Sequence, residues 1–315
     1  MARPDELFMP SESFNSYCPD WASAVLNGFS QIFLQRHPLC GLLCLLAILI
    51  GAPALLGGAL LGGVAGLLTA QRRGYPKADR QAGLFSYNGV LLGLLLSLYF
   101  PWSALLPPLI VACGGISAIL TQQWLKRSRD HHCLPAYTAP FVGLSWLLLS
   151  VAEPMLPANP PLAEPGLLEL LGATAKGLGQ VLFLEQPLAG TLIALGLFLA
   201  NRRAAAWAVF GSAAGLGFSL LHHENPSALL GLGGYNAVLV AIALSQQPRA
   251  LCWLPVPGVA LALLLTPGFA ALGLAPLTAP FILAAWLVRA TVRVMRQAAR
   301  DSAPCTARGN PPRLR

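Results

Sequence analysis

The sequence predicts an all-α polytopic membrane protein made of two inverted repeats, each with five transmembrane helices preceded by a half-membrane helix. Three observations lead to this fold class. Of the 315 residues, 56 % are hydrophobic and only 10 % are charged, so the long uncharged stretches exceed what one soluble core can hold. Three sequence blocks recur in the same order in both halves, and Lys and Arg gather in alternate loops between apolar segments.

The recurring blocks define the repeat unit. The three pairs, first copy before second, are GFSQIFLQRHPLCG at 28–41 and GLGQVLFLEQPLAG at 177–190, GLFSYNGVLLGLLLSL at 83–98 and GLGGYNAVLVAIALSQ at 231–246, and LPAYTAPF at 134–141 and LAPLTAPF at 274–281. The offsets are 149, 148 and 140 residues, so each half is one complete structural unit. Transporters built from such repeats place their substrate site at the repeat interface.

Apolar runs closed by charge, proline or polar clusters predict five spans in each half. The expected spans are 38–52, 54–71, 84–100, 102–125 and 138–152, then 187–201, 204–221, 229–246, 250–267 and 275–292. Ahead of each first span lies a shorter amphipathic segment, 20–32 and 167–182, which is too short and too polar to cross. We expect half-membrane helices there, with ends covered by protein or facing a water-filled cavity.

The positions of Lys and Arg predict the topology, because short loops rich in them stay cytoplasmic. With the N-terminus inside, the basic loops at 71–82, 126–130, 201–203 and 246–249 and the C-terminal tail all lie inside. The longest outer loop, 153–167, has two acids and no base, and only Lys176 falls on the outer side. Five spans per half make the second half enter from the opposite face, so the repeats are inverted. We expect a multi-pass protein of the cell membrane, the inner membrane in a bacterium, with both termini cytoplasmic.

This topology divides the chain into five segments. They are an N-terminal cytoplasmic segment at 1–19, a first repeat at 20–152, an extracytoplasmic linker at 153–166, a second repeat at 167–295 and a basic C-terminal tail at 296–315. The formal net charge of +8 is an orientation signal, and we expect the lipid bilayer rather than nucleic acid as the partner. The seven cysteines are scattered and are typical of small apolar fillers, not of a disulfide or metal set.

Two polar pairs recur in both halves and are the first candidates for a solute site. Gln31 and Gln180 stand at the same place at the end of each half-helix, where an amide offers an acceptor and two donors without charge. Thr138 and Thr278 each precede Ala-Pro-Phe at the start of a span, and inversion would bring their hydroxyls together near the midplane. Each pair has a structural alternative, because Gln also satisfies a broken helix end and Thr is a common N-cap.

Apolar and aromatic residues also recur near these polar pairs, and they predict a flat slot that accepts a planar molecule and excludes water. Tyr87 and Tyr235 open the third span of each half. The residues of the slot are Tyr87, Tyr235, Leu91, Leu239, Ile32, Leu34, Val181 and Phe183. The alternative for any one of them is ordinary core packing, which is typical of aromatics and leucines at helical spacing.

No ionisable residue recurs in both halves at the depth of the spans. An ion-coupled carrier normally has intramembrane carboxylates or histidines, and an enzyme would need a nucleophile or a metal cluster on facing spans. We therefore expect no enzyme, no metal and no cofactor. Familiar water or glycerol channels have paired Asn-Pro-Ala tips, and ammonia channels have a pore His pair; the sequence has neither.

At these six blocks, in this order, the chain resembles the urea transporter family from about residue 20 to 295. The resemblance implies a homotrimer in which each subunit has its own pore and passes urea passively between the repeats. It also implies that Gln31 and Gln180 lie near a narrow filter, that Thr138 and Thr278 lie at its centre, and that the eight apolar residues line the slot. Two alternatives stay open: a channel for another neutral solute such as ammonia, water or glycerol, and an ion-coupled secondary transporter.

Urea suits such a lining, because it is planar and uncharged and carries four N–H donors and one carbonyl acceptor. Helix-end carbonyls, Gln amides and Thr hydroxyls would replace the hydrogen bonds of water, and weak net binding lets the solute leave. The sequence departs from the family pattern at four places: Leu34 stands where an aromatic is expected opposite Phe183, Tyr replaces Phe at 87 and 235, and Ala237 stands opposite Gly89. A filter that lacks one aromatic face would leave room for related amides.

Overall fold

The computed structural model describes residues 20–131, 134–151, 166–223, 225–248 and 251–301. All of the regular elements in these ranges are helices. Three predicted segments lie wholly or mostly outside the described residues: the N-terminal segment 1–19, the linker 153–166 except residue 166, and the tail from residue 302 onward.

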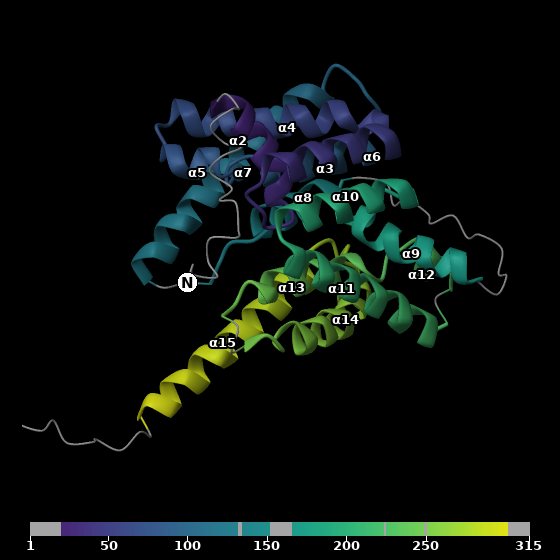
Figure 1. Cartoon of the computed structure of the whole chain (residues 1–315). Helices are drawn as coiled ribbons and strands as arrows, with labels where there is room; N and C mark the ends of the chain where they lie inside the picture. Colours follow the sequence, from purple (N-terminus) through teal and green to yellow (C-terminus); the bar gives the residue numbers. More distant parts are fainter. Residues whose placement is uncertain (1–19, 132–133, 152–165, 224, 249–250, 302–315) are drawn as a thin grey trace, which may run out of the picture.

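Both halves contain the same succession of helices (Figure 1). The first half has α2 (Asp20–Gln31), α3 (Pro38–Gly51), α4 (Pro53–Arg72), α5 (Lys77–Gln81), α6 (Tyr87–Tyr99), α7 (Leu106–His131) and α8 (Ala139–Leu149). The second half has α9 (Leu167–Gly179), the 3-10 turn η2 (Gln180–Leu182), α10 (Pro187–Ala200), α11 (Arg202–Leu221), α12 (Asn225–Leu229), α13 (Tyr235–Ser245), α14 (Pro255–Ala271) and α15 (Ala279–Asp301). The short helices α5 and α12 were not predicted.

Prolines explain why several helices begin where they do. Pro38, Pro53, Pro187 and Pro255 each stand in the first turn of a helix. Proline fits there because its missing N–H would have no intrahelical partner and its φ is already helical. The predicted starts of α3 and α10 are confirmed at the residue, since a proline opens each of them.

The predicted spans lie where helices form, but several helices are shorter than the spans. The helices α6, α8 and α13 have 13, 11 and 11 residues, so at about 1.5 Å per residue each falls well short of the ~30 Å apolar layer of a membrane. In the described part of the chain, α4, α7 and α11 are long and apolar enough to cross a membrane alone. The α9–η2 segment and α10 qualify together, bent by 76°. Ten crossings therefore remain a prediction.

Glycine allows α4 and α6 to pack backbone to backbone. A methyl group added at Gly62 on α4 would lie 2.1 Å from the carbonyl oxygen of Gly89 on α6, which no side chain tolerates. In the second half, α11 and α13 also approach closely, since a methyl group at Gly211 would lie 2.5 Å from the carbonyl oxygen of Ala237. Small residues at such crossings give close packing in an apolar environment, where helices gain little from the hydrophobic effect.

The two halves meet through equivalent elements. The helix α3 packs on α10, its counterpart (Figure 1). The helix α8 likewise contacts its counterpart α15. Two hydrogen bonds across this contact are reciprocal: Trp146 Nε1 donates to the carbonyl of Ala275, and Trp286 Nε1 donates to the carbonyl of Pro135, both at 2.8 Å. Trp146 and Trp286 occupy the same place in the repeat, as do Pro135 and Ala275. Each half therefore supplies one indole donor and one carbonyl acceptor to the other, at equivalent positions.

Candidate functional site

Each half-helix ends in a strained turn. Gln31 is the last residue of α2, and Gln180 directly follows α9. Three residues further on, Leu34 and Phe183 have φ values of 58° and 60°, the left-handed region that favours glycine. Their amides close the turns by donating to the carbonyls of Gln31 and Gln180 at 2.9 and 3.1 Å. A side chain in this conformation costs about 1–2 kcal/mol, so both half-helices end in backbone strain at equivalent positions.

The two glutamine side chains are buried, but their amides differ in hydrogen bonding. Gln180 Nε2 donates to the carbonyl of Leu230 at 3.0 Å, on the segment before α13. Gln31 Oε1 is buried and has no hydrogen-bond partner among the described residues. The alternative that the amides satisfy their own helix ends is therefore not supported by these contacts. An unpartnered buried acceptor is costly, and a solute that carries an N–H group would relieve that cost.

Thr138 and Thr278 lie in contact where α8 and α15 begin. Their hydroxyl oxygens are 2.7 Å apart, so one hydroxyl donates to the other, and both side chains are buried. Thr138 stands at the N-cap position of α8, yet its side chain makes no capping hydrogen bond. The N-cap alternative considered for Thr138 is therefore wrong. The hydroxyl is used between the halves instead.

Two asparagines, which the sequence analysis did not assign a role, do the capping. The backbone N–H of Phe141 on α8 donates to Asn88 Oδ1 at 3.3 Å, and that of Phe281 on α15 donates to Asn236 Oδ1 at 3.1 Å. Each bond satisfies a first-turn amide that no residue of its own helix can pair. Because Asn88 and Asn236 cap from neighbouring helices, the threonine hydroxyls stay free to pair. The signal was present in the sequence, since each asparagine recurs beside a tyrosine in both halves.

The residues just before the threonines also match between the halves. Tyr137 and Leu277 have φ values of 44° and 45°, a second pair of left-handed residues at equivalent positions. The hydroxyl of Tyr87 donates to the carbonyl of Tyr137, and Asn236 Nδ2 donates to the carbonyl of Leu277 at 3.0 Å. The carbonyl that precedes each threonine is thus held by the first turn of α6 or α13.

The eight residues predicted to line a slot all belong to one region of the molecule. Ile32, Tyr87, Leu91, Val181 and Leu239 are buried in the central core, and Leu34, Phe183 and Tyr235 are partly buried and pack against it. This arrangement fits a lining and ordinary packing equally well, so the slot stays a prediction.

Some helix-end carbonyls near Gln31 already have partners. The carbonyl of Phe33 accepts from Gln35 Nε2 at 3.1 Å, and the carbonyl of Leu34 accepts from Gln246 Nε2 at 2.9 Å. Fewer backbone acceptors than expected are therefore available to a solute at this end. Gln246 follows α13, so its bond also joins the two halves.

Neither metal ligands nor disulfides mark the described residues. Within those ranges, no three His, Cys, Asp or Glu side chains gather closely enough to hold a metal ion. Cys40, Cys44 and Cys113 are buried free thiols and Cys252 is an exposed one. The three buried thiols fit the prediction of small apolar fillers, whereas the exposed Cys252 does not.

Comparison with known proteins identifies the family. A sequence model of the family described as Urea transporter matches residues 22–293. The chain belongs to the urea transporter family. Urea transporter 1 of sheep (Ovis aries) and that of goat (Capra hircus) are each 30 % identical over 255 residues, which cover 74 % of this chain and 64 % of the relative. Urea transporter 1 of mouse (Mus musculus) is 28 % identical over 262 residues with the same coverage.

The match runs from inside α2 to the middle of α15, so this urea transporter family member carries the family region in both halves. The chain spans 64 % of the length of the curated relatives. The family membership confirms the resemblance drawn from the six sequence blocks.

Proposed function

We propose that the chain passes urea, and related small amides, passively through a pore between its two halves. The observation that carries the proposal is the buried Thr138–Thr278 pair, whose hydroxyl oxygens are 2.7 Å apart. The buried and unpartnered Gln31 Oε1 is a second acceptor that a solute could use. Membership of the urea transporter family and the names of the relatives support urea as the solute. Gln31, Gln180, Thr138 and Thr278 would supply the polar edge, and the eight slot residues would supply the apolar faces.

We further propose that the halves are inverted repeats related by a pseudo-twofold axis. A twofold contact is self-complementary: if residue i of one half touches residue j of the other, then j of the first touches i of the second. The reciprocal bonds of Trp146 and Trp286 meet this condition. The threonines contact their own counterparts, as residues beside such an axis must. Inverted repeats bind their substrate at this interface.

The hydroxyls of Thr138 and Thr278 suit a neutral solute with several N–H groups, and we call this pair the waist of the proposed pore. Each threonine hydroxyl is both a donor and an acceptor, so urea can exchange a hydrogen bond with either while it passes. Because each net bond is worth only about 0.5–1.5 kcal/mol, the solute binds weakly and leaves. The two bonded hydroxyls leave no room between them, so the solute must pass beside the pair or part it.

The proposal includes the location and the assembly. The protein would lie in the cell membrane, the inner membrane in a bacterium, with both termini cytoplasmic, and three copies would form a homotrimer with one pore in each subunit. Several apolar helices in the described ranges support a membrane location, and the basic loops support the orientation.

The test is urea permeability of proteoliposomes that contain the purified full-length chain, measured by stopped-flow light scattering. We expect urea entry several-fold faster than in protein-free liposomes, with water and glycerol permeability unchanged. Permeability equal to that of empty liposomes would refute the proposal. Faster entry of glycerol or water than of urea would favour the alternative neutral-solute channel.

A further inference from the structure

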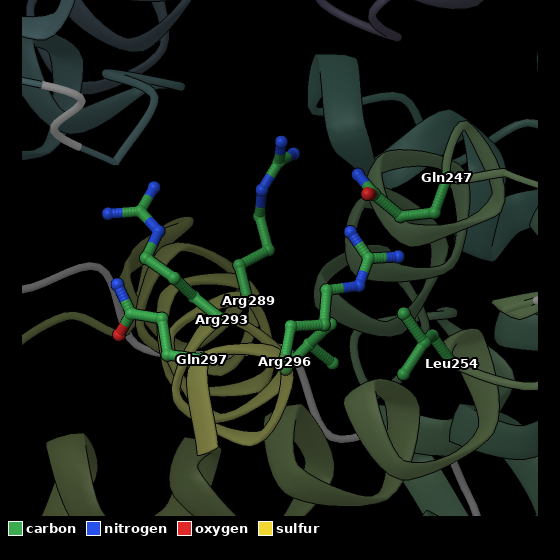
Figure 2. A pocket seen from close by; sticks show the side chains of 7 residues that line it. Gln247, Leu254, Arg289, Arg293, Arg296 and Gln297 are labelled. Atoms are coloured by element: carbon green, nitrogen blue, oxygen red, sulfur yellow. The ribbon is translucent and has the colours of Figure 1, made fainter. Parts of the chain in front are cut away.

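A basic cleft lies along the C-terminal half of α15. Its volume is about 300 Å³, and its lining residues are Gln247, Leu254, Arg289, Val292, Arg293, Arg296 and Gln297. Five of them come from α15, while Gln247 and Leu254 come from the segment that joins α13 to α14. Figure 2 shows the side chains of Arg289, Arg293 and Arg296 extending from α15 on the same side.

The charge of the cleft is unbalanced within the described residues. Three arginines line it together with two amides, and none of the seven lining residues is acidic. The spacing of four and three residues places the three arginines on one helix face, where their like charges repel. Arg289 is held in place, because its Nη1 donates to Tyr137 Oη at 2.9 Å. An anion in the cleft would remove this repulsion.

The donors of the cleft match a tetrahedral oxyanion. Each guanidinium presents several N–H groups in a rigid plane that binds two phosphate oxygens at once, and amide N–H groups add neutral donors. The volume exceeds that of a bare phosphate, so a larger group that carries the phosphate also fits. Leu254 and Val292 give the cleft an apolar side.

The cleft lies where α15 changes from apolar to charged. The helix reads APFILAAWLV up to Val288 and continues as RATVRVMRQAARD from Arg289. Leu283 and Leu287 are exposed on the apolar part, as side chains that face lipid would be. Such a boundary in a membrane protein lies at the depth of the lipid headgroups, and basic pockets on the cytoplasmic side bind anionic headgroups.

We propose that this cleft, which we call the α15 arginine cleft, binds a phosphate-bearing anion. The phosphate belongs either to the headgroup of an anionic phospholipid or to a soluble phosphate. The apolar side of the cleft, and its position at the level of the lipid headgroups, favour the lipid. The proposal is independent of urea passage, because it depends only on the cleft and on the membrane location.

The experiment measures lipid binding to the purified full-length protein by native mass spectrometry, with phosphatidylglycerol and phosphatidylcholine as the probes. The cleft variant is Arg293→Gln with Arg296→Gln, both of which are exposed. The control is Arg72→Gln with Arg73→Gln, two exposed arginines at the end of α4 that remove the same charge elsewhere. Thermal unfolding checks that each variant folds, and Arg296→Gln alone serves if the double variant does not.

We expect the wild type and the control to bind phosphatidylglycerol in preference to phosphatidylcholine. The cleft variant should bind phosphatidylglycerol about tenfold or more weakly, because charge-assisted hydrogen bonds are among the strongest. Displacement of the lipid by millimolar inorganic phosphate would support the site and assign it to soluble phosphate, and failure to displace it would support the site and assign it to lipid. Equal binding by the cleft variant and the control would overturn the proposal.

Discussion

Lys176 makes in the second half the hydrogen bond that Asn27 makes in the first. Lys176 Nζ donates to the carbonyl of Leu229 at 3.1 Å, and Asn27 Nδ2 donates to the carbonyl of Gln81 at 2.7 Å. Both donors sit one residue before a glycine in the repeated block, and both acceptors end a short helix, α12 or α5. Lys176 was the one base predicted on the outer side, and this bond gives it a local role.

The hydrogen bond of Lys176 predicts a difference between two substitutions. Lys176→Met should lower the free energy of unfolding by about 0.5–1.5 kcal/mol, because it leaves the carbonyl of Leu229 without this donor. Lys176→Asn copies the first half and should lose less. Unfolding of both variants in the same detergent provides the measurement, and equal losses would show that the side-chain amide cannot replace the ammonium.

Removal of either threonine hydroxyl should lower the urea permeability. Thr138→Val and Thr278→Val keep the volume but leave one buried hydroxyl and the N–H groups of urea unpaired, which costs about 1–3 kcal/mol. Urea permeability should then fall about tenfold or more. The double variant should fall by less than the product of the two single effects, because both substitutions remove the same bond. Normal permeability in both single variants would rule out a site at the waist.

Removal of the capping asparagines should damage both stability and permeation. Asn88→Leu and Asn236→Leu leave a buried N–H of Phe141 or Phe281 unpaired, and the free energy of unfolding should fall by about 1–3 kcal/mol. Urea permeability should also fall, since each threonine loses its support. Asn201→Ala is the matched control, because Asn201 caps its own helix α11 by accepting from the amide of Ala204 at 3.1 Å. The control should lose stability without losing permeability, and an equal loss of permeability would assign all three effects to folding.

The inverted topology predicts which loops can be reached from outside the cell. In a cysteine-free background, a cysteine at position 158 should react with an impermeant thiol reagent added outside, and one at position 78 should not. The reason is that basic loops such as 71–82 stay cytoplasmic, whereas the linker at 153–166 carries acids and no base. Reaction at 78 but not at 158 would reverse the topology.

Urea flux should follow the urea gradient alone. No carboxylate or histidine recurs at span depth in the two halves, so nothing in the repeat is placed to bind a proton or sodium ion in step with the solute. Flux into proteoliposomes should therefore not change with membrane potential, with a proton gradient, or when choline replaces sodium. Urea accumulation above the external concentration would identify an ion-coupled transporter.

Helix boundaries could be predicted where a local sequence signal marks them. The starts of α3 and α10 were correct because prolines mark them, and the Thr138–Thr278 contact followed from the repeat alone. The predicted start of α13, at residue 229, was too early, because the left-handed turn at Gly231, with a φ of 79°, delays the helix to Tyr235. The predicted start of α6, at residue 84, lies three residues before the helix begins at Tyr87. Periodicity extends an apolar run through such a turn and cannot show where the helix begins.

The recurrence of Asn88 and Asn236 marked them as candidates, but their capping partners could not be predicted for a different reason. The bonds to Phe141 and Phe281 span 53 and 45 residues, so they depend on how α6 packs on α8 and how α13 packs on α15. The reciprocal tryptophan bonds span 129 and 151 residues and depend on the contact between the halves. No window of local sequence contains both partners of these bonds.

The reciprocal hydrogen bonds also show which partners one repeat would lose if it were separated from the other. Cut off from its partner, the first half would hold an indole N–H at Trp146, a hydroxyl at Thr138 and a carbonyl at Pro135, each deprived of its native partner. Inside a bilayer no water replaces such partners, and the second half would be left with the matching deficits. Because the contact is nearly self-complementary, two copies of one half could satisfy each other in the same way. The geometry thus retains the form of a dimer of half-length chains, which duplication and fusion would turn into a single chain.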